Sequence, residues 1–126
     1  FTPGSHGSTF AGNPLGAAAG LATLDVIEDE NLVTNAEARG KQLRDGIMAT
    51  GNPLFVSVRG RGLLDAVELK HPCSHAVMNY CLEHGLIVNA VAPNALRFAP
   101  PLIVTAQDVD QALAILKDVP TDLPDD

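Results

Sequence analysis

Aromatic side chains are scarce in this sequence: they make up 4% of the residues, and tryptophan is absent. A core must therefore be built from Leu, Val, Ile and Ala, which favours helices and small sheets over an aromatic-rich sandwich. Cationic residues are also few, 8 against 15 acidic ones, and they form no run. Because a nucleic-acid backbone or an anionic membrane surface binds clustered cations, we expect neither as a partner.

Long apolar runs are missing too, since no stretch approaches the roughly 20 residues that span a bilayer. A basic-then-apolar leader is also absent, so we expect no secretion signal. Cys73 and Cys81 would lie about 12 Å apart along a helix, beyond the ~7 Å limit for a disulfide. We therefore expect free thiols and a cytoplasmic protein. The chain begins with Phe1 in what reads as the middle of a loop, which indicates processing or truncation.

The first predicted helix is unusual for its lack of a polar face. Asn13 is an expected N-cap and Pro14 fits the first turn. From Leu15 to about Ile27 the segment is Ala-rich and apolar on most sides. Such a helix needs burial all round, and so short a chain offers little to surround it.

A second helix is predicted to begin with the run Glu28-Asp29-Glu30-Asn31, because the helix dipole favours acidic residues at a helix start. Its apolar spacing predicts a buried stripe and a solvated side. The buried stripe comprises Leu32, Ala36, Leu43 and Ile47, and the solvated side Glu37, Arg39, Lys41, Arg44 and Asp45.

Two strand-like runs follow, 54–58 and 63–69, joined by a predicted hairpin turn over 59–62. Arg59 and Arg61 flank Gly60 in this turn. They could form an anion site, but we interpret them as residues that shape the turn.

The remaining pattern predicts a helix over 74–83 that ends at Gly85, strands over 86–89 and 95–98 around a Pro93-Asn94 turn, and a last helix. Thr105 caps that helix, with Asp108 as its capping-box partner and Val109, Leu113 and Leu116 on its inner face. Residues 120–126 form an acidic tail that we expect to be loose. The element order predicts an α+β fold, a small sheet covered by helices.

A zinc site can be considered for Cys73, His75, Cys81 and His84, which are suitable ligand types. Their spacing is poor and lacks a C-x-x-C framework, and Cys81 shares a helix face with apolar residues. We expect no metal site. Asn89 could approach a substrate from its strand end, but a turn-capping role is favoured.

The loop from His6 to Pro14 contains the strongest functional signal. It offers the adjacent hydroxyls of Ser8 and Thr9, glycines that let a backbone come close, and a helix N-terminus just beyond. These parts suit a phosphate group. The alternative is a flexible loop whose Ser, Thr and Asn side chains only cap the following helix.

This loop resembles the HGSTFxGNP segment of class III (ornithine aminotransferase-like) pyridoxal-phosphate-dependent enzymes. Similar blocks recur in family order at 30–32, 58–64 and 96–102, and the resemblance extends to about Leu116. The chain looks most like the C-terminal part of the acetylornithine enzymes. The implied fold is an α+β segment of a fold-type I enzyme: 1–30 end the large domain, 31–119 form the small domain with a mainly antiparallel sheet, and 120–126 are the tail.

The resemblance also implies roles for three residues. Thr9 resembles the threonine that reaches the cofactor phosphate of the other subunit, and Ser8 resembles a substrate contact. Arg97 resembles the arginine that binds the substrate α-carboxylate, a task for which a guanidinium fork is well shaped. Leu96 and Phe98 would place it in a drier site. Without the resemblance, Arg97 could be a strand-edge arginine directed to solvent.

The implied activity of the intact protein is transfer of the δ-amino group of N-acetylornithine to 2-oxoglutarate, which forms glutamate in arginine biosynthesis. The cofactor would be pyridoxal 5′-phosphate, and the protein a homodimer. The Schiff-base lysine of the family precedes this segment, and Lys41, Lys70 and Lys117 do not suit that role, so we expect no catalytic residue and no activity in this chain alone. Alternatives are another amino donor (ornithine or 4-aminobutyrate) and a non-catalytic α+β binding module.

Overall fold

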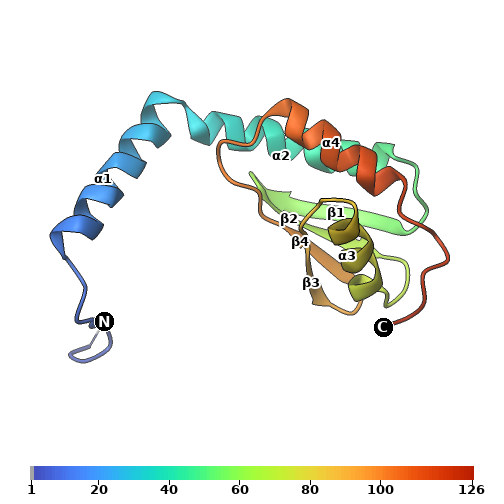
Figure 1. The fold of residues 1–126 in the computed structure, drawn as a ribbon, viewed down its shortest axis with the longest axis horizontal. Coiled ribbons are helices and arrows are strands. Elements are labelled where there is room, and N and C mark those ends of the chain that lie inside the picture. Colours follow the sequence, from blue (N-terminus) through green and yellow to red (C-terminus); the bar gives the residue numbers. More distant parts are fainter. Residues whose placement is uncertain (1) are drawn as a thin grey trace. The chain divides into compact units, whose positions relative to one another are not determined.

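The structure is a computed structural model that describes residues 2–126 (Figure 1). The chain divides into two units, Phe1–Leu32 and Val33–Asp126. Within residues 2–126, none of the helices combines the length and hydrophobicity that a membrane span requires.

The first unit consists of an exposed loop and helix α1 (Pro14–Asp29). The predicted cap is confirmed, because the Asn13 side-chain oxygen accepts a hydrogen bond from the Gly16 N–H at 2.8 Å. None of the α1 residues, all of which the structure describes, is buried. Leu15 is 81% exposed and Leu21 64%. The apolar surface of this helix is thus left uncovered, in line with the expectation that the chain offers little to surround it.

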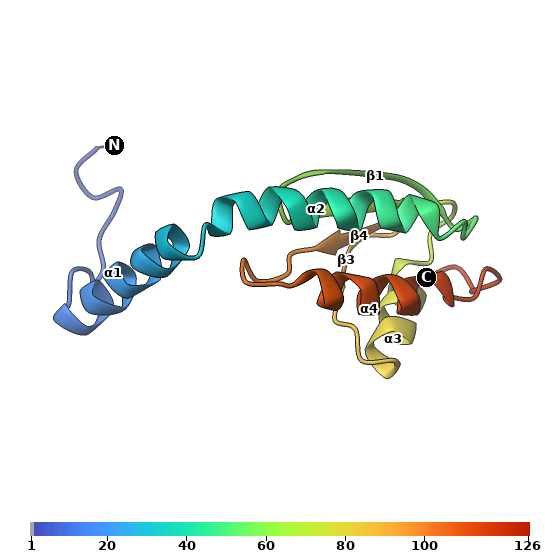
Figure 2. The ribbon, with the colours of Figure 1, turned by 90° about the horizontal axis from the view of Figure 1, so that it is seen from above.

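The second unit is a four-stranded antiparallel sheet with strand order β1-β2-β4-β3 and helices on one face. Figure 2 shows α2 and α4 extending over the sheet. The predicted α+β class is confirmed. The elements are α2 (Leu32–Ala49), β1 (Phe55–Arg61), β2 (Leu64–Leu69), α3 (Ser74–Glu83), β3 (Asn89–Ala92), β4 (Ala95–Phe98) and α4 (Ala106–Lys117).

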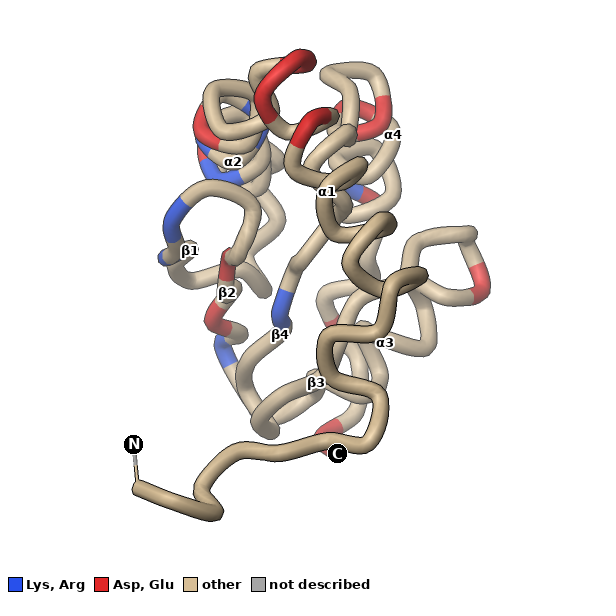
Figure 3. The backbone as a smooth tube through the Cα atoms, turned by 90° about the vertical axis from the view of Figure 1, so that its left-hand side faces the viewer, with Lys and Arg blue, Asp and Glu red and all other residues tan. Residues whose placement is uncertain are grey.

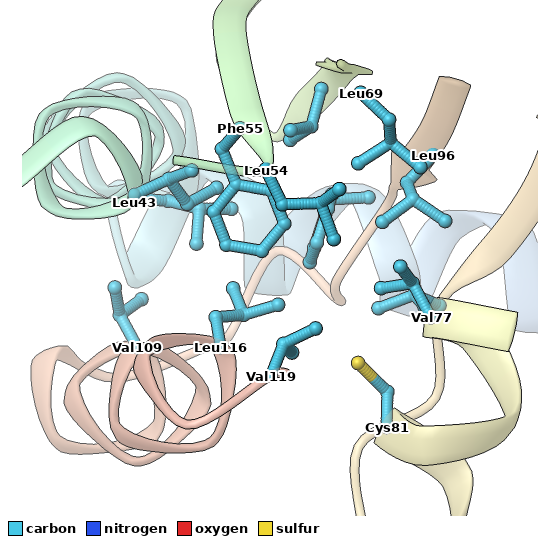
Figure 4. Close-up of a cluster of buried hydrophobic side chains, with 14 of the residues drawn as sticks. Leu43, Leu54, Phe55, Leu69, Val77, Cys81, Leu96, Val109, Leu116 and Val119 are labelled. Atoms are coloured by element: carbon cyan, nitrogen blue, oxygen red, sulfur yellow. The ribbon is translucent and has the colours of Figure 1, made fainter. Parts of the chain in front are cut away.

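The core lies between the sheet and its three helices (Figure 4). Alternation along β2 and β4 directs every second side chain into it. Leu96, Val77 and Leu116 are fully buried there. As the sequence predicted, few aromatic groups take part: Phe55 and Phe98 are the buried aromatic residues among those described.

The end of α1 differs from the prediction. The helix continues to Asp29, so the acidic run closes α1 instead of opening α2, and the first turn of α2 contains no acid. Asn31 adopts a left-handed conformation (φ 52°) at the break between the two helices. Asn is one of the few non-glycine residues that tolerate this region, which explains why the break occurs there.

The predicted hairpin turn is also shifted. Strand β1 continues to Arg61, and the turn is confined to Gly62 and Leu63, with Gly62 at φ 57°. Arg59 and Arg61 are therefore strand residues, and the interpretation that they shape the turn is wrong. The left-handed turn needs the freedom of Gly62, whereas Gly60 continues the strand.

Two further predictions fail in the second half of the chain. Strand β3 begins at Asn89, where the predicted strand ended. The tail is not loose, because the Asp126 carboxylate accepts hydrogen bonds from the Ser74 hydroxyl and the His75 N–H, each at 3.0 Å. The Asp126 N–H also donates to the Pro72 carbonyl at 2.7 Å. By contrast, the bounds of α3 and β4 and the Thr105 capping box are confirmed.

Candidate functional site

The loop before α1 presents the two adjacent hydroxyls that the sequence singled out. Ser8 Oγ accepts a hydrogen bond from the Phe10 N–H at 3.3 Å. Asn13 alone caps α1, so the capping interpretation holds for that residue and not for Ser8 or Thr9. Thr9 is exposed, and neither its hydroxyl nor its N–H bonds to another described residue.

The surroundings of Thr9 leave room for a bound group. A Cβ atom added at Gly7 or at Gly12 would meet no atom within 4 Å. His6, at the start of the loop, has its Nδ1 atom 3.1 Å from Ser5 Oγ. The loop thus offers an anion the Thr9 hydroxyl and N–H as donors that have no competing partner among the described residues.

Arg97 lies on β4, an interior strand between β2 and β3. Leu96 and Phe98 are 0% and 6% exposed, so alternation places Arg97 on the opposite face of the sheet. It is exposed there and is not a strand-edge residue. This chain alone therefore does not supply the dry setting expected from its two apolar neighbours. Its Nη2 atom donates to Asn89 Oδ1 at 3.3 Å, so Asn89 contacts Arg97 instead of capping a turn.

A pocket with a volume of about 370 Å³ adjoins Arg97. Most of its lining is apolar, and its polar groups are Asn89, Arg97 and Asp108. The Asp108 carboxylate is already engaged, because it accepts hydrogen bonds from Thr105 Oγ1 at 2.7 Å and from Thr105 N at 2.8 Å. These bonds, the side-chain one foremost, lower the pKa of Asp108. Arg97 is thus the residue of this lining whose side chain is suited to hold an anion.

A partly buried ion pair between Arg44 and Asp65 lies at β2, the strand next to that of Arg97. Arg44 Nη1 donates to Asp65 Oδ1 at 2.7 Å and to the Gly62 carbonyl at 3.0 Å. Burial raises the pKa of Asp65, and the Arg44 hydrogen bond and charge oppose that rise. The prediction that Arg44 lies on the solvated side of its helix is wrong, because its side chain contacts Gly62 and Asp65 of the β1–β2 hairpin. Asp65 on β2 pairs with Phe98 on β4, so the Arg44–Asp65 contact stabilises the strand pair that contains Arg97.

The four candidate zinc ligands, Cys73, His75, Cys81 and His84, make other contacts. Cys73 and Cys81 are buried free thiols, and burial raises the pKa of Cys81 to about 11. A thiol that stays protonated is a poor metal ligand, and Cys81 belongs to the core as predicted. His75 and His84 contact the Asp126 carboxylate and the Tyr80 carbonyl. Among the residues that the structure describes, no group of three His, Cys, Asp or Glu side chains could hold a metal ion.

The lysines of the chain are solvated. Lys41, Lys70 and Lys117 are all exposed, and Lys41 pairs with Asp45 one turn along α2. The predicted solvated position of Lys41 is confirmed. None of the three lysines has the desolvated setting that activates an amine as a nucleophile.

Comparison with known proteins gives a consistent result. Residues 1–119 match the family described as "Aminotransferase class-III". The whole chain is 98% identical to a part of acetylornithine aminotransferase from Bifidobacterium longum (strain NCC 2705), of which it spans 29%. It is 45% identical to an ornithine aminotransferase from Staphylococcus carnosus over 94% of the chain and 30% of that protein.

A solved structure agrees with the fold. The crystal structure of acetylornithine aminotransferase from Elizabethkingia anophelis matches 93% of the chain and 32% of its own length, with a TM-score of 0.79 and 39% identity. The resemblance to this family, seen in the sequence at 6–14, 58–64 and 96–102, therefore extends to the backbone of the sheet and its helices. This chain belongs to the class III aminotransferases.

Proposed function

We propose that the chain is the C-terminal segment of a pyridoxal-phosphate-dependent aminotransferase that transfers the δ-amino group of N-acetylornithine to 2-oxoglutarate in arginine biosynthesis. The observation that carries this proposal is the 98% identity, over the whole chain, to a relative named acetylornithine aminotransferase. Because the chain spans 29% of that relative, the activity belongs to an intact enzyme. Residues 1–126 alone, whose lysines are all exposed, are expected to be inactive.

The loop around Thr9 fits one part of the cofactor, its phosphate. A phosphate needs hydroxyl and N–H donors without bulky side chains in front of them, and Thr9 is exposed beside open glycines. We assign the Thr9 hydroxyl to the cofactor phosphate and Ser8 to a neighbouring substrate contact. When bound, pyridoxal phosphate supplies the electron sink that stabilises a carbanion at the amino-bearing carbon.

Arg97 is assigned to the α-carboxylate of the substrate. Its guanidinium can bind a carboxylate with two parallel hydrogen bonds, and Asn89 engages Nη2 at 3.3 Å on one side. This contact orients the guanidinium before the substrate arrives. Holding the α-carboxylate fixes one end of the substrate, so that the amino group at the far end is presented at a set distance.

Three broader features complete the proposal. Residues 1–30 end the large domain and residues 31–119 form the small domain. The enzyme is a homodimer in which Thr9 serves the cofactor of the neighbouring subunit. The cytoplasm is the proposed compartment, supported by the two buried free thiols, which are typical of reducing surroundings.

The test is a steady-state assay of the intact enzyme with N-acetylornithine, ornithine and 4-aminobutyrate as donors and 2-oxoglutarate as acceptor. We expect kcat/KM to be highest for N-acetylornithine. Arg97→Lys should lower kcat/KM roughly 10- to 100-fold, because a point charge replaces a bidentate fork.

Lys70→Arg, at an exposed position after β2, is the matched control and should leave kcat/KM unchanged. A higher kcat/KM for ornithine would agree with an aminotransferase but would contradict N-acetylornithine as the amino donor. Full activity of Arg97→Lys would contradict the assignment of the carboxylate site.

A further inference from the structure

The loop that contains Thr9 has no lysine or arginine to attract an anion. Residues 2–24 contain no Lys, Arg, Asp or Glu, and Figure 3 draws both the loop and the start of α1 in the colour of uncharged residues. An anion at Thr9 would therefore be held by hydroxyl and N–H donors of this loop. Such hydrogen bonds weaken steeply when their geometry is poor. Binding at Thr9 thus depends on how accurately the loop is held in place.

Two consecutive turns shape this loop. The first is closed by the Ala11 N–H, which donates to the Ser8 carbonyl at 3.2 Å, and Thr9 lies at its first corner. The second is closed by the Asn13 N–H, which donates to the Phe10 carbonyl at 3.2 Å. The turns span 8–11 and 10–13, so they overlap. A contact that fixes the second turn therefore also restrains Thr9.

The side-chain amide of Asn13 joins the second turn to helix α1. Its Oδ1 atom caps the helix by accepting a hydrogen bond from the Gly16 N–H at 2.8 Å. Its Nδ2 atom donates to the Phe10 carbonyl at 2.7 Å, a bond that capping does not require. A Ser or Asp side chain could cap α1 as well as Asn does, but neither has an amide N–H for the loop.

Gly16 leaves the space that this amide occupies. A Cβ atom added at Gly16 would lie 3.0 Å from Asn13 Nδ2, so the amide would have to shift. One turn further along α1, a Cβ atom at Gly20 would meet no atom within 4 Å. Gly12, which leads from the loop into Asn13, has a φ of 70°, a left-handed conformation that glycine adopts without strain. The backbone on both sides of Asn13 thus accommodates the bridge from loop to helix.

We infer that Asn13 is a positioning residue for the cofactor: its amide fixes the loop to the start of α1 and so holds the Thr9 hydroxyl and N–H in place for the phosphate. This inference rests on the proposed function, in which Thr9 binds the phosphate of pyridoxal phosphate. Asn13 acts through Thr9 and needs no contact of its own with the cofactor. The affinity for the phosphate group therefore depends on Asn13, whereas the affinity for the pyridine ring and its aldehyde does not.

The test compares pyridoxal phosphate with pyridoxal, which lacks the phosphate, in absorbance titrations of the intact enzyme freed of cofactor. Asn13→Ser and Asn13→Asp keep a helix cap and lose the amide N–H. Each should lower the affinity for pyridoxal phosphate roughly 3- to 10-fold, the effect of one hydrogen bond. The affinity for pyridoxal and the thermal unfolding midpoint should stay at their wild-type values.

Two outcomes for these variants would overturn the inference. An equal fall in both affinities would show that Asn13 only stabilises the fold. A fall for pyridoxal phosphate in Asn13→Asp and not in Asn13→Ser would assign the effect to the added negative charge.

Gly16→Ala and Gly20→Ala form a matched pair in α1. Gly16→Ala should lower the ratio of the affinity for pyridoxal phosphate to that for pyridoxal, because the new Cβ atom displaces the Asn13 amide. Gly20→Ala, the same change one turn further on, should leave this ratio unchanged. A wild-type ratio in Gly16→Ala and in both Asn13 variants would contradict the role of the amide.

Thr9→Val separates this inference from the proposed function, because it removes the hydroxyl and keeps the shape of the side chain. It should lower the affinity for pyridoxal phosphate and leave that for pyridoxal unchanged. A wild-type ratio of the two affinities in Thr9→Val would refute the phosphate role of Thr9 in the proposed function. A lowered ratio in Thr9→Val, with wild-type ratios in both Asn13 variants, would refute the role of Asn13 alone.

Discussion

Gly40 lies where α2 crosses the turn between β1 and β2. A Cβ atom at this position would be 1.7 Å from the Gly62 carbonyl oxygen. Arg44, one helical turn further on, donates to the same oxygen at 3.0 Å and to buried Asp65 at 2.7 Å. The absence of a side chain at Gly40 thus permits the close approach, which the partly buried Arg44–Asp65 ion pair stabilises.

Gly40→Ala is expected to destabilise the second unit by about 1–3 kcal/mol, the usual effect of overpacking a tight contact. Urea unfolding of the 126-residue chain, followed by the fluorescence of its only tyrosine, Tyr80 in α3, measures this. The control is Gly20→Ala in α1, where an added Cβ meets no atom within 4 Å. It should cause no loss, because Ala favours helix over Gly. An unfolding midpoint of Gly40→Ala equal to that of wild type would contradict the close approach.

At the residue scale, the sequence predicted chemical types better than orientations. Residues 63–69 have apolar side chains on both faces of the strand. The alternation therefore could not show that Asp65 points into the core. Arg44, the partner of Asp65, was predicted to face solvent, since the residue pattern of a helix does not reveal what packs against it. That Arg59 and Arg97 lie on the same face of the sheet was not predicted for a related reason. A turn placed at 59–62 does not allow the observed register of β1 with β2.

The elements whose ends are set by local contacts were predicted well. Thr105 with Asp108, and Asn13 before Pro14, are short-range signals that each form within one turn of helix. The bounds of β1 and β3 depend on the register in which each pairs with the next strand, which the residue pattern did not define, and both were misplaced. The tail was misjudged because an acidic terminus gives no local sign of what it binds.

The tail completes helix α3. The N-cap residue Cys73 makes no side-chain capping bond, and the Asp126 carboxylate takes that role by accepting from the N–H groups of His75 and Ala76. Burial acts to raise the pKa of Asp126, but the hydrogen bonds from His75, Ser74 and Ala76 outweigh it and lower the pKa to about 2. The tail is therefore a structural part of the unit.

Asp126→Ala should cost about 1 kcal/mol, the usual value of a lost helix cap, and speed hydrogen exchange at His75 and Ala76. In the wild type the stabilisation is present above the ordinary Asp pKa of about 4 and is lost as pH falls through the folded value. Hydrogen exchange by NMR at pH 6 measures the effect. Asp122→Ala, an exposed change in the same tail, should have none; equal protection in both variants would contradict the capping role.

At the scale of the whole molecule, the two units contrast sharply. The second has a closed core that includes Leu43, Leu96 and Leu116, whereas α1 leaves its apolar side chains exposed. The proposed intact enzyme accounts for this contrast, because α1 would then be covered by the rest of the large domain. On the same proposal, this segment would supply phosphate and carboxylate contacts, and the lysine suited to attack would belong to another part of the enzyme.

The central claim is tested most directly by the absorbance of the intact protein titrated with pyridoxal phosphate and then with N-acetylornithine. We predict a saturable band of bound cofactor that changes on addition of N-acetylornithine, and less readily with ornithine. A band that changes with neither donor would contradict the assignment of N-acetylornithine as the substrate. The absence of any bound-cofactor band would contradict the account itself, including the role of Thr9.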